Sequence, residues 1–342
     1  MSAKAVMLGP DNDLFRQRVE ELNAIAQRTG HAVEFRLVDA RQSADLIVEN
    51  CGDAIALVPG TSGNIHQFSP EAFVDLVRRL PHVKLVQTPS SGTDHLDKSA
   101  LAAFGVAVAN HGGANAPAVA EHTIMMMVAV LRKVPTQLTS VKAGTWSRPL
   151  TAFPETEFRT LVGKRVGLVG LGRIGSRVAR RLQGWECQVC YSDVIAFSSS
   201  YERELGVTRT DFNTLLETCD VVSLHVPLEP DTFHLMSGPQ LARMKPTAIL
   251  INTCRGPVVD EAALMKALEA KTIFGAGLDV LETEPMPADY PLAAMPNVMI
   301  TPHAATRAVE STDNAKLFMI ENIERLSRGE PLQSVVPPAH SP

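Results

Sequence analysis

The sequence has few aromatic side chains and no excess of positive charge, and each shortage excludes a class of protein. Tryptophan, tyrosine and phenylalanine make up 5% of the 342 residues, so aliphatic side chains and methionine must fill the core. That composition suits layers of helices and parallel strands better than an aromatic-rich β-sandwich. Lysine and arginine number 32 against 37 aspartates and glutamates, a net charge of −5. This balance gives no general attraction for nucleic acids or anionic lipids.

Long apolar runs and a disulfide framework are also missing. The longest apolar run, Ile124–Leu131, is far shorter than the roughly 20 residues that span a bilayer. The five cysteines are an odd number, which is not typical of paired disulfides. Cys187 and Cys190 form a C-x-x-C pair in a predicted strand, where residues three apart face opposite sides. We therefore expect a cytoplasmic protein with reduced thiols, no membrane partner and no metal.

Short apolar stretches alternate with amphipathic helical patterns along the chain. The predicted strands are Ala5–Leu8, Val33–Val38, Ala54–Val58, Lys84–Thr88, Val106–Ala109, Arg165–Gly170, Gln188–Ser192, Val221–Val226, Ala248–Asn252, Ile273–Leu278 and Val298–Thr301. The clearest helical patterns between them are Asp13–Arg28, Pro70–Leu80 with Ser69 as its N-cap, and Ile174–Gln183. This alternation predicts an α/β protein with doubly wound parallel sheets.

Residues 135–163 interrupt the alternation. The stretch contains three prolines and two glycines and has no clear periodicity, so we expect an irregular connection. Before it, Ala118–Val134 is predicted as one long apolar helix with a methionine cluster at 125–127. Such a cluster is typical of a core or a subunit interface.

A glycine-rich turn follows the predicted strand at Arg165–Gly170. The segment Gly170-Leu171-Gly172-Arg173-Ile174-Gly175 matches G-x-G-x-x-G, and a helical pattern comes next. The first glycine permits a tight turn, the second lets the backbone approach a pyrophosphate, and the third allows close packing of the helix. A glycine turn without a ligand is the alternative, but the strand and helix around this one favour a dinucleotide site.

Asp193 ends the next predicted strand, eighteen residues after Gly175. A carboxylate there accepts hydrogen bonds from the hydroxyls of the adenosine ribose and repels a 2′-phosphate. The residues that follow, Val194-Ile195-Ala196, supply no cation. The sequence therefore predicts NAD rather than NADP as the cofactor.

Three further segments together resemble one known family. They are Asn252-Thr253-Cys254-Arg255-Gly256-Pro257-Val258-Val259-Asp260-Glu261, Gly275–Pro285 (GAGLDVLETEP) and Thr301-Pro302-His303. The N-terminal half adds Gly92–Asp97 (GTDHLD) and Ala118–Thr123 (AVAEHT). With these motifs nearly the whole chain resembles the D-isomer-specific 2-hydroxyacid dehydrogenases.

Reduction of a 2-oxo acid needs a cation for the carboxylate, a proton donor for the carbonyl oxygen and a source of hydride. Arg255 offers a planar fork that can hold the carboxylate and polarise the carbonyl. His303 is the natural proton donor, since imidazole gains and loses a proton near neutral pH. Glu284 can pair with His303, favour its protonated form and fix its orientation. The resemblance implies these same roles.

The resemblance implies further ligands. Ser91 and Gly92 would offer backbone N–H groups to the substrate carboxylate, across a cleft from Arg255. Asp279 would bind the nicotinamide carboxamide. Residues lining the cofactor would be Thr253 and Cys254 at the nicotinamide ring, and Val226 and Pro227 at the adenosine. Three histidines, His95, His122 and His225, are assigned structural roles.

One segment departs from the family pattern. Ala304-Ala305-Thr306-Arg307-Ala308 follows His303, with Ala308 where the family often has threonine. Residues here shape the substrate pocket, so the departure leaves the identity of the substrate open. Glutamate at 284 disfavours formate, because the related formate dehydrogenases have glutamine there.

The resemblance also implies a domain layout. A Rossmann NAD-binding domain, 118–304, would be inserted in a flavodoxin-like catalytic domain made of 1–117 and 305–342. Family members are typically homodimers joined through the NAD-binding domains. The expected activity is interconversion of a D-2-hydroxy acid and its 2-oxo acid. Two alternatives are oxidation of another small anion such as phosphite, and an NAD(H)-sensing corepressor-type interaction protein.

Overall fold

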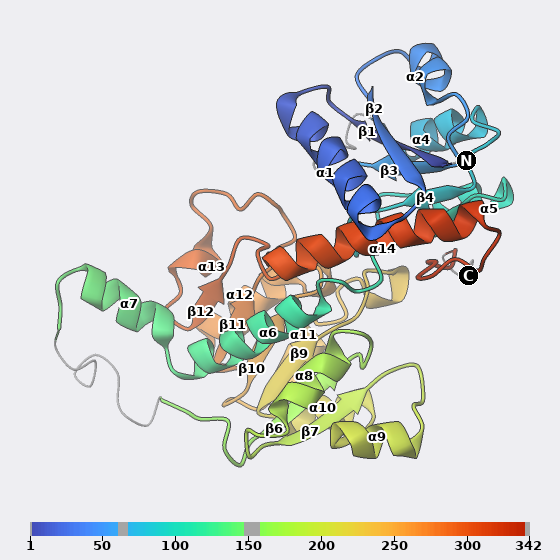
Figure 1. The fold of residues 1–342 in the computed structure, drawn as a ribbon. Coiled ribbons are helices and arrows are strands. Elements are labelled where there is room, and N and C mark those ends of the chain that lie inside the picture. Colours follow the sequence, from blue (N-terminus) through green and yellow to red (C-terminus); the bar gives the residue numbers. More distant parts are fainter. Residues whose placement is uncertain (1, 61–67, 147–157, 339–342) are drawn as a thin grey trace. The chain divides into compact units, whose positions relative to one another are not determined.

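The computed structural model describes residues 2–60, 68–146 and 158–338 and divides the chain into two compact units (Figure 1). Unit 1 comprises Met1–Asn115 and Ala308–Pro342, and unit 2 comprises Ala116–Arg307. Each unit contains one parallel sheet. Among the described residues, no helix is long and apolar enough to cross a membrane.

Unit 1 is built on a five-stranded parallel sheet with the order β2-β1-β3-β4-β5. The strands are β1 (Ala3–Gly9), β2 (Val33–Asp39), β3 (Ala56–Pro59), β4 (Leu85–Gln87) and β5 (Ala107–Ala109). The described helices are α1 (Asp13–Thr29), α2 (Ala44–Cys51), α4 (Pro70–Arg78), α5 (Lys98–Ala103) and α14 (Val309–Ser327). Alternate residues of β1 pack with α1 and α14 on one face and with α2, α4 and α5 on the other. Both faces are thus covered, as continuous apolar strands predict.

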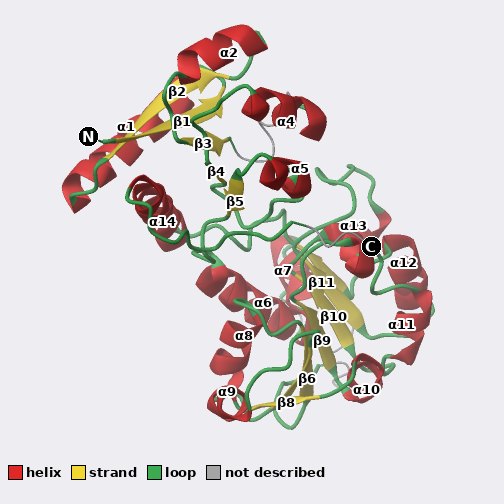
Figure 2. Cartoon of the chain, turned by 90° about the vertical axis from the view of Figure 1, so that its right-hand side faces the viewer, coloured by secondary structure: helices red, strands yellow, loops and turns green. Residues whose placement is uncertain are grey.

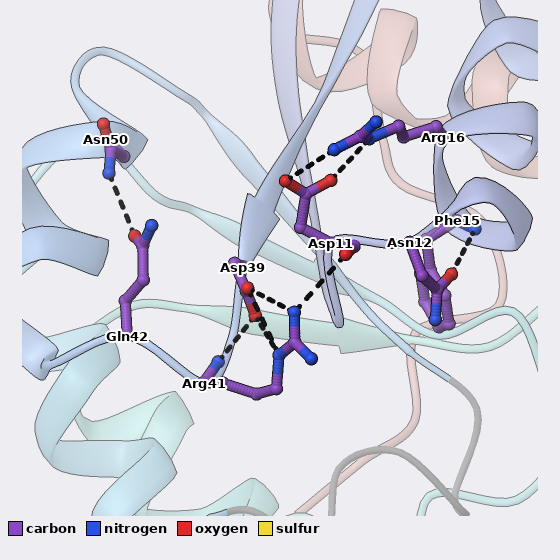
Figure 3. A network of polar contacts seen from close by, with 8 residues as sticks. All are labelled: Asp11, Asn12, Phe15, Arg16, Asp39, Arg41, Gln42 and Asn50. Atoms are coloured by element: carbon purple, nitrogen blue, oxygen red, sulfur yellow. Dashed lines mark hydrogen bonds and ion pairs between the residues drawn. The ribbon is translucent and has the colours of Figure 1, made fainter.

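Charged side chains tie together the loops that follow β1 and β2 (Figure 3). Arg41 donates to the Asp39 carboxylate at 2.9 and 2.7 Å and to the Asp11 carbonyl oxygen at 3.3 Å. Arg16 of α1 holds the Asp11 carboxylate with two hydrogen bonds of 2.7 and 3.0 Å. The hydrogen bonds from Arg41 lower the pKa of Asp39 to about 2, although burial opposes this. The two loops are thereby linked at the carboxyl edge of the sheet.

A buried carboxylate holds α14 in unit 1. Glu324 is 4% exposed, and its Oε2 lies 2.6 Å from Nδ1 of His31. Its Oε1 accepts the N–H of Ala32 at 2.9 Å and lies 2.9 Å from the Arg328 guanidinium. Burial alone would raise the pKa of Glu324, but these partners leave it below its ordinary value. The stabilisation is therefore present above the pKa of an unfolded glutamate and is lost as the pH falls through the lowered folded value.

Replacing Glu324 by glutamine tests this link. Glu324→Gln should lower the free energy of unfolding by about 1–3 kcal/mol near neutral pH, because buried donors lose a charged acceptor. The difference from wild type should shrink as the pH falls below about 4, where the wild-type carboxylate also loses its charge. Urea unfolding measures both. Glu330→Gln is the control, since that carboxylate is 43% exposed and lies 3.5 Å from Arg325; an equal loss in both variants would contradict the prediction.

Unit 2 is built on a seven-stranded parallel sheet with the order β12-β11-β10-β9-β6-β7-β8. The strands are β6 (Arg165–Val169), β7 (Gln188–Ser192), β8 (Val207–Arg209), β9 (Val221–Leu224), β10 (Ile249–Asn252), β11 (Gly275–Leu278) and β12 (Val298–Ile300). The order reverses between β6 and β9. Ligands of open parallel sheets bind at the carboxyl ends of the strands beside such a reversal.

Helices cover both faces of this sheet (Figure 2). The described helices are α6 (Ala116–Leu131), α7 (Val134–Lys142), α8 (Gly175–Leu182), α9 (Ser199–Leu205), α10 (Phe212–Thr218), α11 (Gly238–Arg243), α12 (Glu261–Glu269) and α13 (Pro291–Ala294), with 3₁₀ turns η3 (Pro230–Thr232) and η4 (Gly256–Val258). One core contains buried side chains of α6 and α8, among them Met126, Met127 and Leu182. The other contains buried side chains of α10, α11 and α12.

The predicted fold class, an α/β protein with doubly wound parallel sheets, is confirmed. All the predicted strands are present with ends within about two residues of those expected. The prediction missed β8, a three-residue edge strand in which only Val207 is buried. Such a strand gives no apolar run in the sequence.

The expectation of an irregular connection from residue 135 onward was wrong for its first part. The predicted helix Ala118–Val134 ends at Leu131, and α7 begins at Val134. Lys133 has a φ of +50°, a left-handed conformation that breaks the helix, and Pro135 lies in the first turn of α7. Residues 147–157 of this stretch lie outside the described residues.

The two cysteines of the C-x-x-C pair have separate surroundings. Cys190 is buried on β7, and its Sγ lies 3.3 Å from the Sγ of Cys219. Cys187 precedes β7 and its thiol donates weakly to the Leu182 carbonyl oxygen at 3.9 Å. The nearest sulfur to Cys190 therefore comes from the end of α10.

Candidate functional site

Loops at the carboxyl ends of the unit 2 strands carry most of the residues singled out in the sequence. The glycine loop follows β6, Asp193 follows β7, Val226 and Pro227 follow β9, Thr253, Cys254 and Arg255 follow β10, Asp279 follows β11, and His303 follows β12. Glu284 lies in the loop between β11 and α13. Because parallel strands run in one direction, these loops gather along one edge of the sheet.

Each glycine of the loop after β6 is required, or tolerated, for a different structural reason. Gly170 has a φ of +97°, and a Cβ there would lie 2.6 Å from the His225 carbonyl oxygen. A Cβ on Gly175 would lie 2.2 Å from the Gly170 carbonyl oxygen. A Cβ on Gly172 would meet nothing within 4 Å, so the loop opens onto empty space there. Arg173 and Ile174 complete the turn into α8, whose N-terminus favours an anion.

The carboxylate of Asp193 is fixed beside this loop. Its Oδ2 accepts the N–H of Leu171 at 2.7 Å, and its Oδ1 accepts the N–H of Ile195 at 2.8 Å. Each oxygen keeps a lone pair, so the carboxylate can accept two neighbouring hydroxyls. The open glycine loop, the helix N-terminus and this carboxylate fit a dinucleotide with an unphosphorylated ribose.

His225 and Cys254 are uncharged groups in the loops after β9 and β10. Burial lowers the pKa of His225 to about 4, and its Nε2 lies 3.0 Å from Oγ of Ser223. Burial raises the pKa of Cys254 to about 11, and its thiol donates to Oδ1 of Asn252 at 3.1 Å. Thr253 is also buried and shares a 2.9 Å hydrogen bond with Thr123 of α6. His225, Cys254 and Thr253 thus fix the loops by neutral hydrogen bonds and bring no charge to them.

His303 and Glu284 form a pair in the loops after β12 and β11. Nδ1 of His303 lies 2.8 Å from Oε2 of Glu284, and the other carboxylate oxygen accepts the N–H of Leu281 at 3.0 Å. The two side chains are 42% and 37% exposed. Because Nδ1 faces Glu284, Nε2 is the ring nitrogen that remains for another partner.

The loop that carries Arg255 contacts the loop that carries Glu284. A Cβ on Gly256 would lie 1.9 Å from the backbone carbon and oxygen of Leu281. Asn252, 1% exposed, donates to the Arg255 carbonyl oxygen at 2.8 Å and accepts the N–H of Cys254 at 3.0 Å. Gly256 therefore lets the two backbones touch. Arg255, Glu284 and His303 follow β10, β11 and β12, which are neighbours in the sheet.

Asp279 has contacts that the sequence does not reveal. The residue is 1% exposed, and its Oδ1 accepts the hydroxyl of Thr301 at 2.5 Å and the N–H of Ala304 at 2.9 Å. Its Oδ2 accepts the N–H of Ala305 at 2.9 Å. His122 of α6 completes the group, with Nε2 3.0 Å from Oγ1 of Thr301. Whatever it binds in addition, Asp279 anchors the segment that contains His303.

Glu261, at the start of α12, was not singled out as functional. It is 6% exposed, and burial raises its pKa. Its Oε1 accepts the N–H of Glu282 at 2.6 Å, and the Tyr290 hydroxyl donates to Oε2. The available signal in the sequence was an acidic pair, Asp260-Glu261, after the apolar residues Val258 and Val259. Glu261 therefore secures both sides of the loop that carries Glu284.

Ser91 and Gly92 lie in unit 1, in the loop after β4. Oγ of Ser91 donates to Oδ1 of Asn115 at 3.1 Å and lies 3.2 Å from Nε2 of His111. The carbonyl oxygen of Gly92 accepts the Ser90 hydroxyl at 3.0 Å. The loop is thus held by a contact of its own and by two side chains of the segment after β5.

Arg209 is a cation beside Asp193 that no pattern in the sequence indicated. Its Nη2 donates to the Asp193 carbonyl oxygen at 3.0 Å. Arg209 ends β8, the strand that was not predicted, so only the sheet pairing reveals its position. Within the described part of the chain, no cluster of three or more histidine, cysteine, aspartate or glutamate side chains could hold a metal ion.

The contact at Gly256 gives a testable prediction. Gly256→Ala should lower the free energy of unfolding of the protein by about 1–3 kcal/mol, because the new methyl group cannot fit beside the Leu281 backbone. Gly238→Ala is a matched control, since a Cβ there meets nothing within 4 Å. Thermal and urea unfolding compare the two variants. Equal stability of both would show that the Gly256 contact is not required.

Comparisons with known proteins agree with this arrangement. The family model for the NAD-binding domain of D-isomer specific 2-hydroxyacid dehydrogenases matches residues 124–305. A glyoxylate reductase of Thermofilum pendens is 38% identical over 266 residues, 76% of this chain and 75% of that protein. The apo structure of D-mandelate dehydrogenase from Rhodotorula graminis has a TM-score of 0.85 at 27% identity, covering 100% of this chain and 99% of that one. D-lactate dehydrogenase with NAD⁺ from Lactobacillus jensenii has a TM-score of 0.76 at 30% identity, covering 98% and 99%.

The family model spans more than half of the chain, and it matches the unit that holds the glycine loop, Asp193 and the His303–Glu284 pair. The glyoxylate reductase extends the similarity over most of both sequences. Solved structures with the same fold include complexes with NAD. This chain belongs to the D-isomer specific 2-hydroxyacid dehydrogenase family and is an NAD-dependent oxidoreductase.

Proposed function

We propose that the enzyme interconverts a small 2-oxo acid and its D-2-hydroxy acid, with His303 as the acid/base group. The observation that carries this proposal is the 2.8 Å contact between Nδ1 of His303 and Oε2 of Glu284. The loop that carries Glu284 also touches the loop that carries Arg255. A histidine oriented by a carboxylate, beside an arginine, matches the needs of carbonyl reduction.

Arg255 binds the substrate carboxylate and polarises the neighbouring carbonyl. A guanidinium presents two parallel N–H groups to a carboxylate, which fixes both its position and its plane. Its Nη1 also donates to the Cys254 carbonyl oxygen at 2.6 Å, which restrains the side chain. The arginine thereby orients the carbon that receives hydride.

His303 donates a proton from Nε2 to the carbonyl oxygen during reduction and takes it back from the hydroxyl during oxidation. Glu284 holds Nδ1 and fixes the orientation of the ring. The backbone of His303 is left-handed, with a φ of +49°, and its N–H donates to the Asp279 carbonyl oxygen at 2.8 Å. Ser91 and Gly92 are proposed as N–H donors to the substrate carboxylate.

The cofactor supplies hydride when bound. We assign its pyrophosphate to Gly170, Gly172, Arg173, Ile174 and Gly175, where a Cβ on Gly172 would meet open space. Asp193 holds the adenosine ribose, and Val226 and Pro227 flank the adenosine. Thr253, Cys254 and Asp279 lie on the nicotinamide side. All the proposed cofactor ligands therefore lie in unit 2.

The substrate proposed first is glyoxylate or a similarly small 2-oxo acid. The relative from Thermofilum pendens is named glyoxylate reductase, while the structural relative from Rhodotorula graminis acts on mandelate, which is larger. The segment after His303 offers only small side chains at Ala304, Ala305 and Ala308. Small side chains in this segment would also leave space for a larger substrate. The assay must therefore include a bulky 2-oxo acid beside glyoxylate.

A panel of substrates tests the activity. Oxidation of NADH, followed by its absorbance, is expected with at least one of glyoxylate, hydroxypyruvate, pyruvate and an aryl 2-oxo acid. Reduction of NAD⁺ by phosphite is not expected. Absence of turnover with every 2-oxo acid would contradict the proposal, and turnover with phosphite alone would favour the small-anion alternative.

His303→Ala should reduce turnover in the same assay by roughly 10²–10⁴-fold, the usual contribution of general acid–base catalysis, while NAD⁺ still binds. His234→Ala is the matched control, since Nε2 of His234 lies 2.5 Å from Oε1 of Glu282 in a similarly exposed pair. The control should keep turnover close to wild type. Unchanged turnover in His303→Ala would remove this residue from the mechanism.

We also propose that two copies associate through unit 2. Helix α7 has no buried residue, and Figure 1 shows it standing clear of the sheet of its unit. Leu138, Val141 and Trp146 are 55%, 51% and 88% exposed. Met125 of α6 is 40% exposed next to the buried Met126 and Met127. An apolar surface of this kind is typical of a subunit interface.

Leu138→Asp should convert the dimer to monomers, because it places a charge in the proposed interface. Leu14→Asp is the matched control, since Leu14 is 54% exposed on α1 of unit 1. Light scattering after size-exclusion chromatography measures the mass. A monomeric wild type, or equal behaviour of both variants, would contradict the proposed interface.

A further inference from the structure

The edge strand β8 brings a cation to Asp193, the residue proposed to bind the adenosine ribose. β8 pairs in parallel with β7, and Arg209 is in register with Tyr191, two residues before Asp193. Nη2 of Arg209 donates to the Asp193 carbonyl oxygen at 3.0 Å. The side chain of Arg209 is exposed, and a guanidinium has five N–H donors. Most of its hydrogen-bonding capacity is therefore available to a ligand.

The surroundings of Asp193 are open. Val194 is 99% exposed and Ile195 is 60% exposed, while both oxygens of the Asp193 carboxylate are held by backbone N–H groups. A phosphate on the ribose 2′ position would replace a hydroxyl that faces this carboxylate. Like charges would then repel at hydrogen-bond distance, although an arginine lies beside the same residue.

We infer that Arg209 is a second determinant of cofactor choice, a latent ligand for the 2′-phosphate of NADP(H) that the charge of Asp193 overrides. The preference for NAD then depends on one carboxylate and not on the absence of a cation. This inference rests on the proposed role of Asp193 as the ribose ligand. The chemistry is that of an arginine fork and a phosphate, a strong charge-assisted pair.

Binding of NAD⁺ and NADP⁺, measured by isothermal titration calorimetry, tests the inference without an activity assay. Asp193→Ala should shift the ratio of the two dissociation constants toward NADP⁺ by roughly tenfold or more. Adding Arg209→Ala to this variant should weaken NADP⁺ by a similar factor and leave NAD⁺ nearly unchanged. Arg209→Lys, which keeps the charge but not the fork, should fall between the two.

Arg203→Ala in the Asp193→Ala background is the matched control, because Arg203 is an exposed arginine of the neighbouring helix α9. It should leave NADP⁺ binding near that of Asp193→Ala. Should Asp193→Ala unfold, Asp193→Asn removes the same charge, and Arg209→Ala alone should weaken the residual binding of NADP⁺ to the wild type.

The outcomes separate the two claims. An unchanged ratio in Asp193→Ala would overturn the ribose role of Asp193 and the inference with it. A changed ratio that is insensitive to Arg209→Ala would overturn the role of Arg209 alone. Equal loss of NADP⁺ binding in Arg203→Ala and Arg209→Ala would reduce Arg209 to a general contribution of charge and also overturn the inference.

Discussion

The buried carboxylate of Asp279 holds the backbone that carries His303, the proposed acid/base residue. His303 has a left-handed conformation, which costs a residue with a side chain about 1 kcal/mol or more. The N–H of His303 donates to the Asp279 carbonyl oxygen at 2.8 Å, and the carboxylate accepts the N–H groups of Ala304 and Ala305. With its side chain 42% exposed, His303 is placed by this held backbone more than by packing.

The direction of the strands supplies the second constraint. Neighbouring parallel strands lie about 4.8 Å apart, so the loops after β10, β11 and β12 start close together. Gly256 then lets the first of these loops touch the second at Leu281. The glycine loop and Asp193 lie on the other half of the same edge, after β6 and β7. One sheet edge thus carries both the candidate dinucleotide site and the proposed acid/base pair.

The sequence was sufficient for the parts of the structure that depend on local pattern. Buried parallel strands are continuous apolar runs, and polar residues directly after them mark the carboxyl edge. It was insufficient where the partner is distant in the chain. The roles of Asp279 and Glu261 depend on Thr301, Ala305 and Tyr290, which no spacing rule connects to them. Arg209 was missed because β8 has one buried residue and so no apolar run.

Buried polar groups also fix the position of α14 along the sheet of unit 1, which the chain rejoins after the residues of unit 2. Apolar contacts of Met319, Ile320 and Ile323 favour burial of this helix but are compatible with a shift along the sheet. Asn322 is 1% exposed, and its Nδ2 donates to Oε1 of the buried Gln87 at 2.7 Å.

A shift of one turn would break the hydrogen bond between Asn322 and Gln87 and the contacts of Glu324 with His31 and Ala32. Each buried polar group left unsatisfied costs about 1–3 kcal/mol. The hydrophobic residues therefore supply the stabilisation, whereas the buried amides and the carboxylate select the register. Unit 2, Ala116–Arg307, lies in the chain between the two parts of unit 1. This long separation adds little to the entropic cost of docking α14, because the entropy of loop closure grows only with the logarithm of length.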